Sequence, residues 1–179
     1  MAKTYTLHVA GLTRELPICK INDHLDIAAF IMFSDVELTI ACAKALLEKC
    51  PDFDVILTAE AKGIPLAYEM SRQSGKQWIP ARKGVKGYMT DPVIVEDQSI
   101  TTAGKQTLVI DKKDLDYMNG KRILIVDDVI STGGSLHALE TLAAKSTGTV
   151  VGCCAALAEG DAAKRTDIFF LEPLPLFAH

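Results

Sequence analysis

The chain has 179 residues, 49% of which are hydrophobic, and a formal net charge of −4 at pH 7. This length suffices for a full hydrophobic core, and we expect residues 1–179 to form a single domain. The apolar content argues against disorder, and the modest acidic balance argues against a nucleic-acid partner. No apolar run approaches the length that spans a membrane and no signal peptide precedes Tyr5, so we expect a cytoplasmic protein without membrane association.

The first 30 residues predict a hairpin that lies outside the pattern of the rest of the chain. Residues 5–9 and 16–21 alternate weakly between polar and apolar side chains, and a turn at 10–13 separates them. Such a pattern favours two antiparallel strands. We expect residues 1–30 to form a small hood over a site.

Helices and buried strands alternate through the rest of the chain. A capping box that begins at Ser34 predicts the start of the first helix, and Pro51 ends it. Short apolar runs are typical of parallel strands buried on both faces. These predicted strands are residues 55–58, 78–81, 123–126, 149–157 and 168–171, after which Pro173 and Pro175 finish the chain. This order predicts an α/β fold, in which helices flank a doubly wound parallel sheet.

The stretch from Arg122 to Ser135 carries the strongest chemical signal. Asp127 and Asp128 follow the apolar strand at the point where we expect it to leave the sheet. Small residues come next, so several backbone N–H groups can point at one anion at the start of the following helix, where a phosphate is favoured. This phosphate nest consists of Ser131, Thr132, Gly133, Gly134 and Ser135. Two acids repel a phosphate, so Asp127 and Asp128 must bind something else, most simply ribose hydroxyls or a hydrated Mg²⁺.

Two further turns combine glycine with positive charge, as an anion site requires. Their candidate residues are Ala61, Lys62 and Gly63 in the first turn and Arg82, Lys83 and Lys86 in the second. At Gly63, glycine allows either a positive φ or a close approach to a ligand. An ordinary strand-to-helix turn and a solvated face are the alternatives. Both turns, the nest and a fourth turn at 158–161 follow predicted strands, and parallel sheets bind ligands beyond the carboxyl ends of their strands, so we expect one composite site.

The segment Val126-Asp-Asp-Val-Ile-Ser-Thr-Gly-Gly-Ser135 resembles the phosphoribosyl pyrophosphate (PRPP) motif of type I phosphoribosyltransferases. Glu60-Ala-Lys-Gly63 is similar to a turn of adenine phosphoribosyltransferases, and Trp78-Ile-Pro-Ala-Arg-Lys83 is similar to a segment of adenine- and xanthine-type enzymes. The resemblance covers about residues 50 to 157. It implies the type I phosphoribosyltransferase fold, with a flexible β flap at 84–104 that closes over the substrates, and a homodimer.

The resemblance also implies an activity, which is displacement of pyrophosphate from C1 of PRPP by a nitrogen of a purine base, with adenine ranked first. Asp127 and Asp128 would be the catalytic residues, while the nest and the two cationic turns would bind the phosphates of PRPP. Mg²⁺ would be bound mainly through PRPP, with no side-chain ligands assigned. The candidates for base binding are Glu159, after the strand that ends at Leu157, and Asp26, which we place at the start of the first helix.

One position leaves the choice of base open. Adenine-type enzymes carry a glutamate in the flexible loop, whereas Thr102 stands at that position here. This departure brings the chain closer to xanthine-type enzymes, and use of xanthine, guanine or hypoxanthine is the first alternative. The second alternative is a non-catalytic regulator that senses PRPP or a nucleotide, although no helix-turn-helix precedes the domain.

Overall fold

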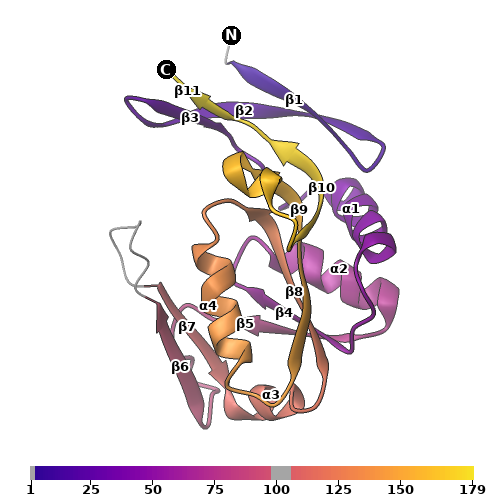
Figure 1. Ribbon diagram of the computed structural model, residues 1–179, viewed down its shortest axis with the longest axis vertical. Helices are drawn as coiled ribbons and strands as arrows, with labels where there is room; N and C mark the ends of the chain where they lie inside the picture. Colours follow the sequence, from indigo (N-terminus) through magenta and orange to yellow (C-terminus); the bar gives the residue numbers. More distant parts are fainter. Residues whose placement is uncertain (1–2, 98–105) are drawn as a thin grey trace.

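The computed structural model describes residues 3–97 and 106–179, and a parallel sheet forms its centre (Figure 1). The five strands run in the order β10-β9-β8-β4-β5, so β8 is the middle strand. They are β4 (Val55–Ala59), β5 (Gln77–Ala81), β8 (Arg122–Ile130), β9 (Thr149–Glu159) and β10 (Phe169–Leu174). The apolar, β-branched runs in the sequence form these strands because both faces of the sheet are covered.

Helices cover both faces of the sheet, as the doubly wound prediction requires. α1 (Val36–Lys49) and α2 (Ile64–Ser74) pack on one face, and α4 (Gly134–Ala143) packs on the other (Figure 1). Side chains of β8 alternate between the two cores, because successive residues of a strand point to opposite faces. Ile123 and Ile125 join the core beneath α4, whereas Leu124 joins the core beneath α1 and α2. The predicted fold class is confirmed.

A small antiparallel sheet forms the hood beyond the end of the parallel sheet (Figure 1). Its order is β1-β2-β3-β11, and the turn between β1 and β2 uses Gly11 with a φ of 77°. Its strands are β1 (Thr4–Val9), β2 (Leu12–Asn22), β3 (Leu25–Ala28) and β11 (Leu176–Ala178). The C-terminal strand β11 was not predicted, because Pro173 and Pro175 were taken to finish the chain. Both ends of the chain therefore build the hood, and the rings of Tyr5 and Phe177 pack edge to face at 5.8 Å.

Two strands form the predicted flap, β6 (Pro92–Asp97) and β7 (Gln106–Asp111), which pair antiparallel. The flap packs on α4 through the buried side chains of Val95 and Leu108. It is also joined to the edge of the central sheet, since Arg82 and Val109 exchange backbone hydrogen bonds of 2.8 and 2.7 Å. Thr102, the position of the expected loop glutamate, lies outside the described residues.

Three local predictions were wrong or incomplete. Asp35, not Ser34, caps α1, because its carboxylate accepts from the Leu38 amide at 3.1 Å while Ser34 has a φ of 68°. Arg14 of the hood holds the same carboxylate at 2.7 Å, which fixes the cap. Asp26 lies in β3 rather than at a helix start. The short helix α3 (Lys112–Tyr117) was not predicted.

None of the helices in the described part of the chain is long and apolar enough to cross a membrane.

Candidate active site

The central sheet opens at the acidic pair of β8. The ladder between β4 and β8 ends at the pair Leu57 and Ile125, whereas the ladder between β8 and β9 continues to Ile130. The sequence predicts that Asp127 and Asp128 stand where the strand leaves the sheet. In the structure both acids lie within β8, past its pairing with β4 but still beside β9. Strand order reverses between β4 and β8, and crevices at such switch points bind ligands in open α/β sheets.

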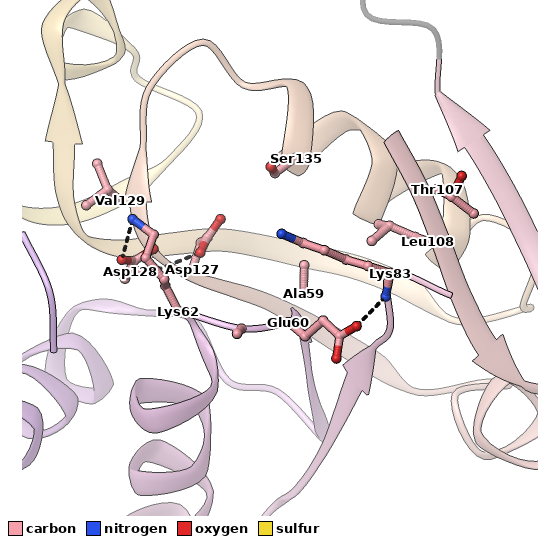
Figure 2. Close-up of a pocket in the computed structure, with 11 residues that line it drawn as sticks. Ala59, Glu60, Lys62, Lys83, Thr107, Leu108, Asp127, Asp128, Val129 and Ser135 are labelled. Carbon is pink, nitrogen blue, oxygen red and sulfur yellow. Dashed lines mark hydrogen bonds and ion pairs between the residues drawn. The ribbon is translucent and has the colours of Figure 1, made fainter. Parts of the chain in front are cut away.

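A cavity of about 510 Å³ lies at this crevice (Figure 2). Its walls come from the end of β4 and the turn that follows it, the loop after β5, the flap strand β7, β8 and the start of α4. The lining residues are Ala59, Glu60, Ala61, Lys62, Lys83, Thr107, Leu108, Asp127, Asp128, Val129 and Ser135. The structure thus brings together predicted residues from three separate turns. The predicted residues that are not part of this lining are Gly63, Arg82, Lys86, Ser131, Thr132, Gly133 and Gly134.

The two carboxylates of β8 face unfavourable surroundings. Asp128 is 3% exposed, and its Oδ2 atom has no hydrogen-bond partner among the described residues. Lys62 Nζ lies 3.3 Å from this oxygen, which is an ion-pair distance without hydrogen-bond geometry. Burial, and then the neighbouring Asp128 carboxylate, raise the pKa of Asp127 well above its usual range, and Lys62 offsets only part of this shift. A buried carboxyl group with a raised pKa, next to a carboxylate oxygen that lacks a hydrogen bond, indicates a functional site when both line a cavity.

Gly63 lets the first cationic turn approach these acids. Its φ is −76°, so the positive φ that we considered is not the reason for glycine here. A Cβ at this position would stand 2.5 Å from Thr58 Oγ1 and 3.1 Å from Asp127 Oδ1. Only glycine therefore allows Lys62 to lie beside the acidic pair. Glycine is therefore needed at position 63 because the turn passes close to Thr58 and Asp127, not because it passes close to a ligand.

Glu60 organises the second cationic turn. The sequence analysis named this residue only as part of a motif and assigned it no role. Its carboxylate accepts from Arg82 Nε at 2.5 Å and from the Lys83 amide at 2.6 Å. The Arg82 guanidinium also contacts the Tyr88 hydroxyl. Arg82 is consequently engaged by protein groups, and the side chain of Lys83 points into the cavity (Figure 2). Of the predicted cations, Lys62 and Lys83 are the ones that line the cavity.

A second cavity, of about 610 Å³, lies between the hood and the phosphate nest. Its lining residues are Ile21, Leu25, Ile27, Ser131, Thr132, Glu159, Asp161, Ala162, Arg165 and Leu176. Glu159 stands at the end of β9, and burial raises the pKa of its carboxyl. Leu25 and Ile27 of β3 are in this lining. Asp26 lies between them and is not, because successive side chains of a strand point to opposite faces. Gly133, with a φ of 84°, caps α4 between the two cavities.

No group of three or more His, Cys, Asp or Glu side chains within residues 3–97 and 106–179 could hold a metal ion. Asp127 and Asp128 supply the carboxylate oxygens of the first cavity that could contact a metal ion bound to a ligand. The described part of the chain thus supplies cations, a buried acidic pair and a glycine-rich helix start along one continuous edge. This arrangement defines an α/β protein whose sheet edge gathers the residue types that we expect to bind anionic and hydroxyl groups.

Comparison with known proteins identifies the family. The model of the Phosphoribosyl transferase domain matches residues 37–172, and the chain belongs to this family. Adenine phosphoribosyltransferase of Malacoplasma penetrans is 33% identical over 108 residues, which are 60% of this chain and 60% of the relative. That of Rhodococcus jostii is 30% identical over 126 residues, which are 70% and 69% of the two chains. The chain therefore spans about 60% of the former relative.

Solved structures share the fold. Adenine phosphoribosyltransferase from Thermoanaerobacter pseudethanolicus superimposes with a TM-score of 0.66 at 23% identity, over 79% of this chain and 84% of that chain. The enzyme from Leishmania tarentolae gives a TM-score of 0.63 at 21% identity, over 78% and 70% of the two chains. At these identities the likeness establishes the type I architecture and no residue's role.

We expect Gly63→Ala to lower the free energy of unfolding by about 1–3 kcal/mol, because the added methyl group overlaps Thr58 Oγ1 in a packed region. Gly84→Ala is the matched control, since open space surrounds a Cβ there. Urea denaturation of both variants measures the difference. Equal stability of the two variants would contradict the close approach described above.

The raised pKa of Asp127 predicts how stability changes with pH. The folded protein keeps a proton on this carboxyl that the unfolded chain releases near pH 4. The free energy of unfolding therefore falls as the pH rises from about 4 through the raised pKa. Asp127→Asn removes this dependence, so its stability should fall less than that of the wild type between about pH 5 and pH 9. Parallel curves from denaturation at several pH values would rule out the shift.

Proposed function

We propose that the protein transfers the phosphoribosyl group of PRPP to a purine base, with adenine as the preferred base, and releases pyrophosphate. The observation that carries this proposal is the set of charged and anion-binding groups that meet at the edge of the sheet. Lys62, Lys83, Asp127, Asp128 and Ser135 line one cavity, and the phosphate nest that ends at Ser135 follows β8 directly. PRPP carries a pyrophosphate, ribose hydroxyls and a 5′-phosphate, which these cations, acids and nest could bind in turn.

The acidic pair would bind the ribose. Ribose hydroxyls can donate to the unpartnered Asp128 Oδ2 and to the Asp127 carboxylate, which relieves part of the cost of burying these groups. As the bond from C1 to pyrophosphate breaks, positive charge grows on the sugar. The Asp128 carboxylate, and Asp127 once it has lost its proton, would stabilise that charge, because β8 holds both side chains in place at the cavity.

The cations would stabilise the leaving group. Lys62 and Lys83 reach the cavity from two turns, so they can contact pyrophosphate from two sides. Glu60 keeps Arg82 engaged and orients the Lys83 turn. The nest fixes the 5′-phosphate, and this anchoring positions C1 between the leaving group and the incoming nitrogen.

Mg²⁺ fits this site as a partner of the substrate. A buried carboxylate oxygen without a hydrogen-bond partner offers one hard donor, and two lysines alone do not neutralise a pyrophosphate. The ion would be held mainly by oxygens of PRPP, with Asp127 and Asp128 near the ribose. When bound, it supplies charge neutralisation for the leaving pyrophosphate.

The second cavity would hold the base. Ile21, Leu25 and Leu176 give it apolar walls, which suit the faces of a flat heterocycle, and the Glu159 carboxylate provides a polar edge. Adenine offers an exocyclic amine that can donate to Glu159, whereas xanthine presents carbonyl oxygens that a carboxylate repels. The names of the relatives from Malacoplasma penetrans and Rhodococcus jostii support adenine as well. Xanthine, guanine and hypoxanthine are the alternative bases, because Thr102 replaces the expected glutamate.

We further infer that the enzyme is a cytoplasmic homodimer that functions in purine salvage. Exposed apolar side chains on α1 and α2, namely Val36, Ile40 and Tyr68, support association of two copies. A regulator that binds PRPP without turnover is the remaining candidate of another class, and release of pyrophosphate separates the two.

We expect pyrophosphate release when PRPP and Mg²⁺ are mixed with adenine, and much slower release with xanthine, guanine or hypoxanthine. Excess chelator should abolish the activity. Glu159→Gln should reduce the preference for adenine by at least about tenfold, because a half-buried partner of the amine is weakened. No turnover with any of the four bases would reject the proposed function, and unchanged base preference in the variant would reject only the role of Glu159.

Asp127→Asn and Asp128→Asn should each lower the turnover rate by about 100-fold or more, since each removes a carboxyl group that can stabilise positive charge on the sugar in the transition state. Both variants should stay folded, because their neighbours accommodate a side chain of the same size. Asp116→Asn, which changes an exposed acid of α3, is the control. Initial rates and thermal melting are measured together, and wild-type rates in both site variants would contradict the role of the acidic pair.

A further inference from the structure

One cation beside the phosphate nest has no role in the mechanism described so far. Arg165 follows the short 3₁₀ helix η1 (Gly160–Lys164), in a part of the chain that our sequence analysis did not select. It lines the second cavity together with Ser131 and Thr132, which begin the nest. Among the described residues that line this cavity, Arg165 is the one cation.

The Arg165 guanidinium lies directly against the nest. A Cβ on Gly133 would stand 3.0 Å from Arg165 Nη1. Glycine is favoured at this position for two reasons. It allows the φ of 84°, and it leaves room for the guanidinium. A Cβ at this position would require the guanidinium to shift by a few tenths of an ångström.

Asp167 fixes the orientation of this guanidinium. Arg165 Nε and Nη2 donate to the two carboxylate oxygens of Asp167 at 2.8 and 2.7 Å. This fork occupies one edge of the planar group, and Nη1 has no hydrogen-bond partner within the described part of the chain. Because the side chain is only one-third exposed, the guanidinium is held in place and not left free in solvent.

The chemistry of the nest leaves a place for such a group. Its backbone N–H groups are neutral donors, and Lys62 and Lys83 line the other cavity. A phosphate dianion binds more strongly when a charged donor joins the backbone amides. Asp161 also lines this cavity, but its side chain is 94% exposed, so water screens its charge whether or not it pairs with Lys164.

We propose that Arg165 is a binding residue for the 5′-phosphate, to which it donates through Nη1 from the hood side of the nest. This inference rests on the proposed function, since it takes the nest to hold the 5′-phosphate of PRPP and of the product nucleotide. Gly133 and Asp167 are then positioning residues, one by leaving room for the guanidinium and the other by orienting it.

The test compares ligands that differ only in the phosphate. Affinities of AMP and adenosine are measured by calorimetry for the wild type, Arg165→Gln and Lys164→Gln. We expect Arg165→Gln to weaken AMP binding by about tenfold or more and to leave adenosine binding unchanged. Lys164→Gln removes the same charge from the neighbouring residue and should change neither affinity. A loss that is equal for both ligands, or no loss, would overturn the inference.

Two milder variants keep the test decisive if Arg165→Gln fails to fold. Arg165→Lys keeps the charge but lacks the fork to Asp167, and Asp167→Asn weakens that fork while Arg165 remains. Each should weaken AMP binding by a smaller factor than Arg165→Gln, again without an effect on adenosine. Turnover of PRPP by the wild type is scored separately. A wild type that binds AMP through Arg165 but turns over no base would overturn the proposed function and leave this inference standing.

Discussion

The burial of two neighbouring carboxyl groups is the constraint on which the site depends. Asp127 and Asp128 stand where β8 parts from β4, and burial, followed by repulsion from Asp128, disfavours the charged form of Asp127. The rest of the edge compensates for this cost in part. Lys62 is brought to the pair by a turn that only Gly63 can close so tightly. A ligand with hydroxyl groups can relieve the remaining free-energy cost of burying the acids. The free protein therefore already has the site arranged for a substrate.

Local sequence signals were enough to predict the fold and the centre of the site. The apolar runs that became β4, β8 and β9 could be assigned because a strand buried on both faces needs no alternation. The acids and the nest could be assigned because their chemistry is concentrated in one contiguous stretch, 127–135. The carboxyl ends of parallel strands meet at one edge, so four separate turns could be predicted to form one site. Residues of three of them line the first cavity, whereas the turn at 158–161 lines the second cavity.

Relations between distant parts of the chain could not be predicted. Nothing near Glu60 in the sequence indicates that its carboxylate holds Arg82, and nothing near Arg165 indicates that it lies over the nest. Asp26 was misplaced because the register of β3, which decides the face of each side chain, is set by its partners β2 and β11. The cap of α1 moved to Asp35 because the hood contributes Arg14 to it. In each case the deciding contact lies far along the chain.

The strand β11 has a consequence for the order in which the molecule assembles. Leu176 pairs with Ile27 across the hood, although the whole parallel sheet lies between them in the sequence. Contacts that close so long a loop form late, because the entropy of closure must first be offset by the structure between the ends. During synthesis the β1–β2 hairpin can form locally, whereas the β3 edge of the hood stays unpaired until β11 has been made. The apolar wall of the second cavity, to which Leu176 contributes, is completed only when β11 has paired.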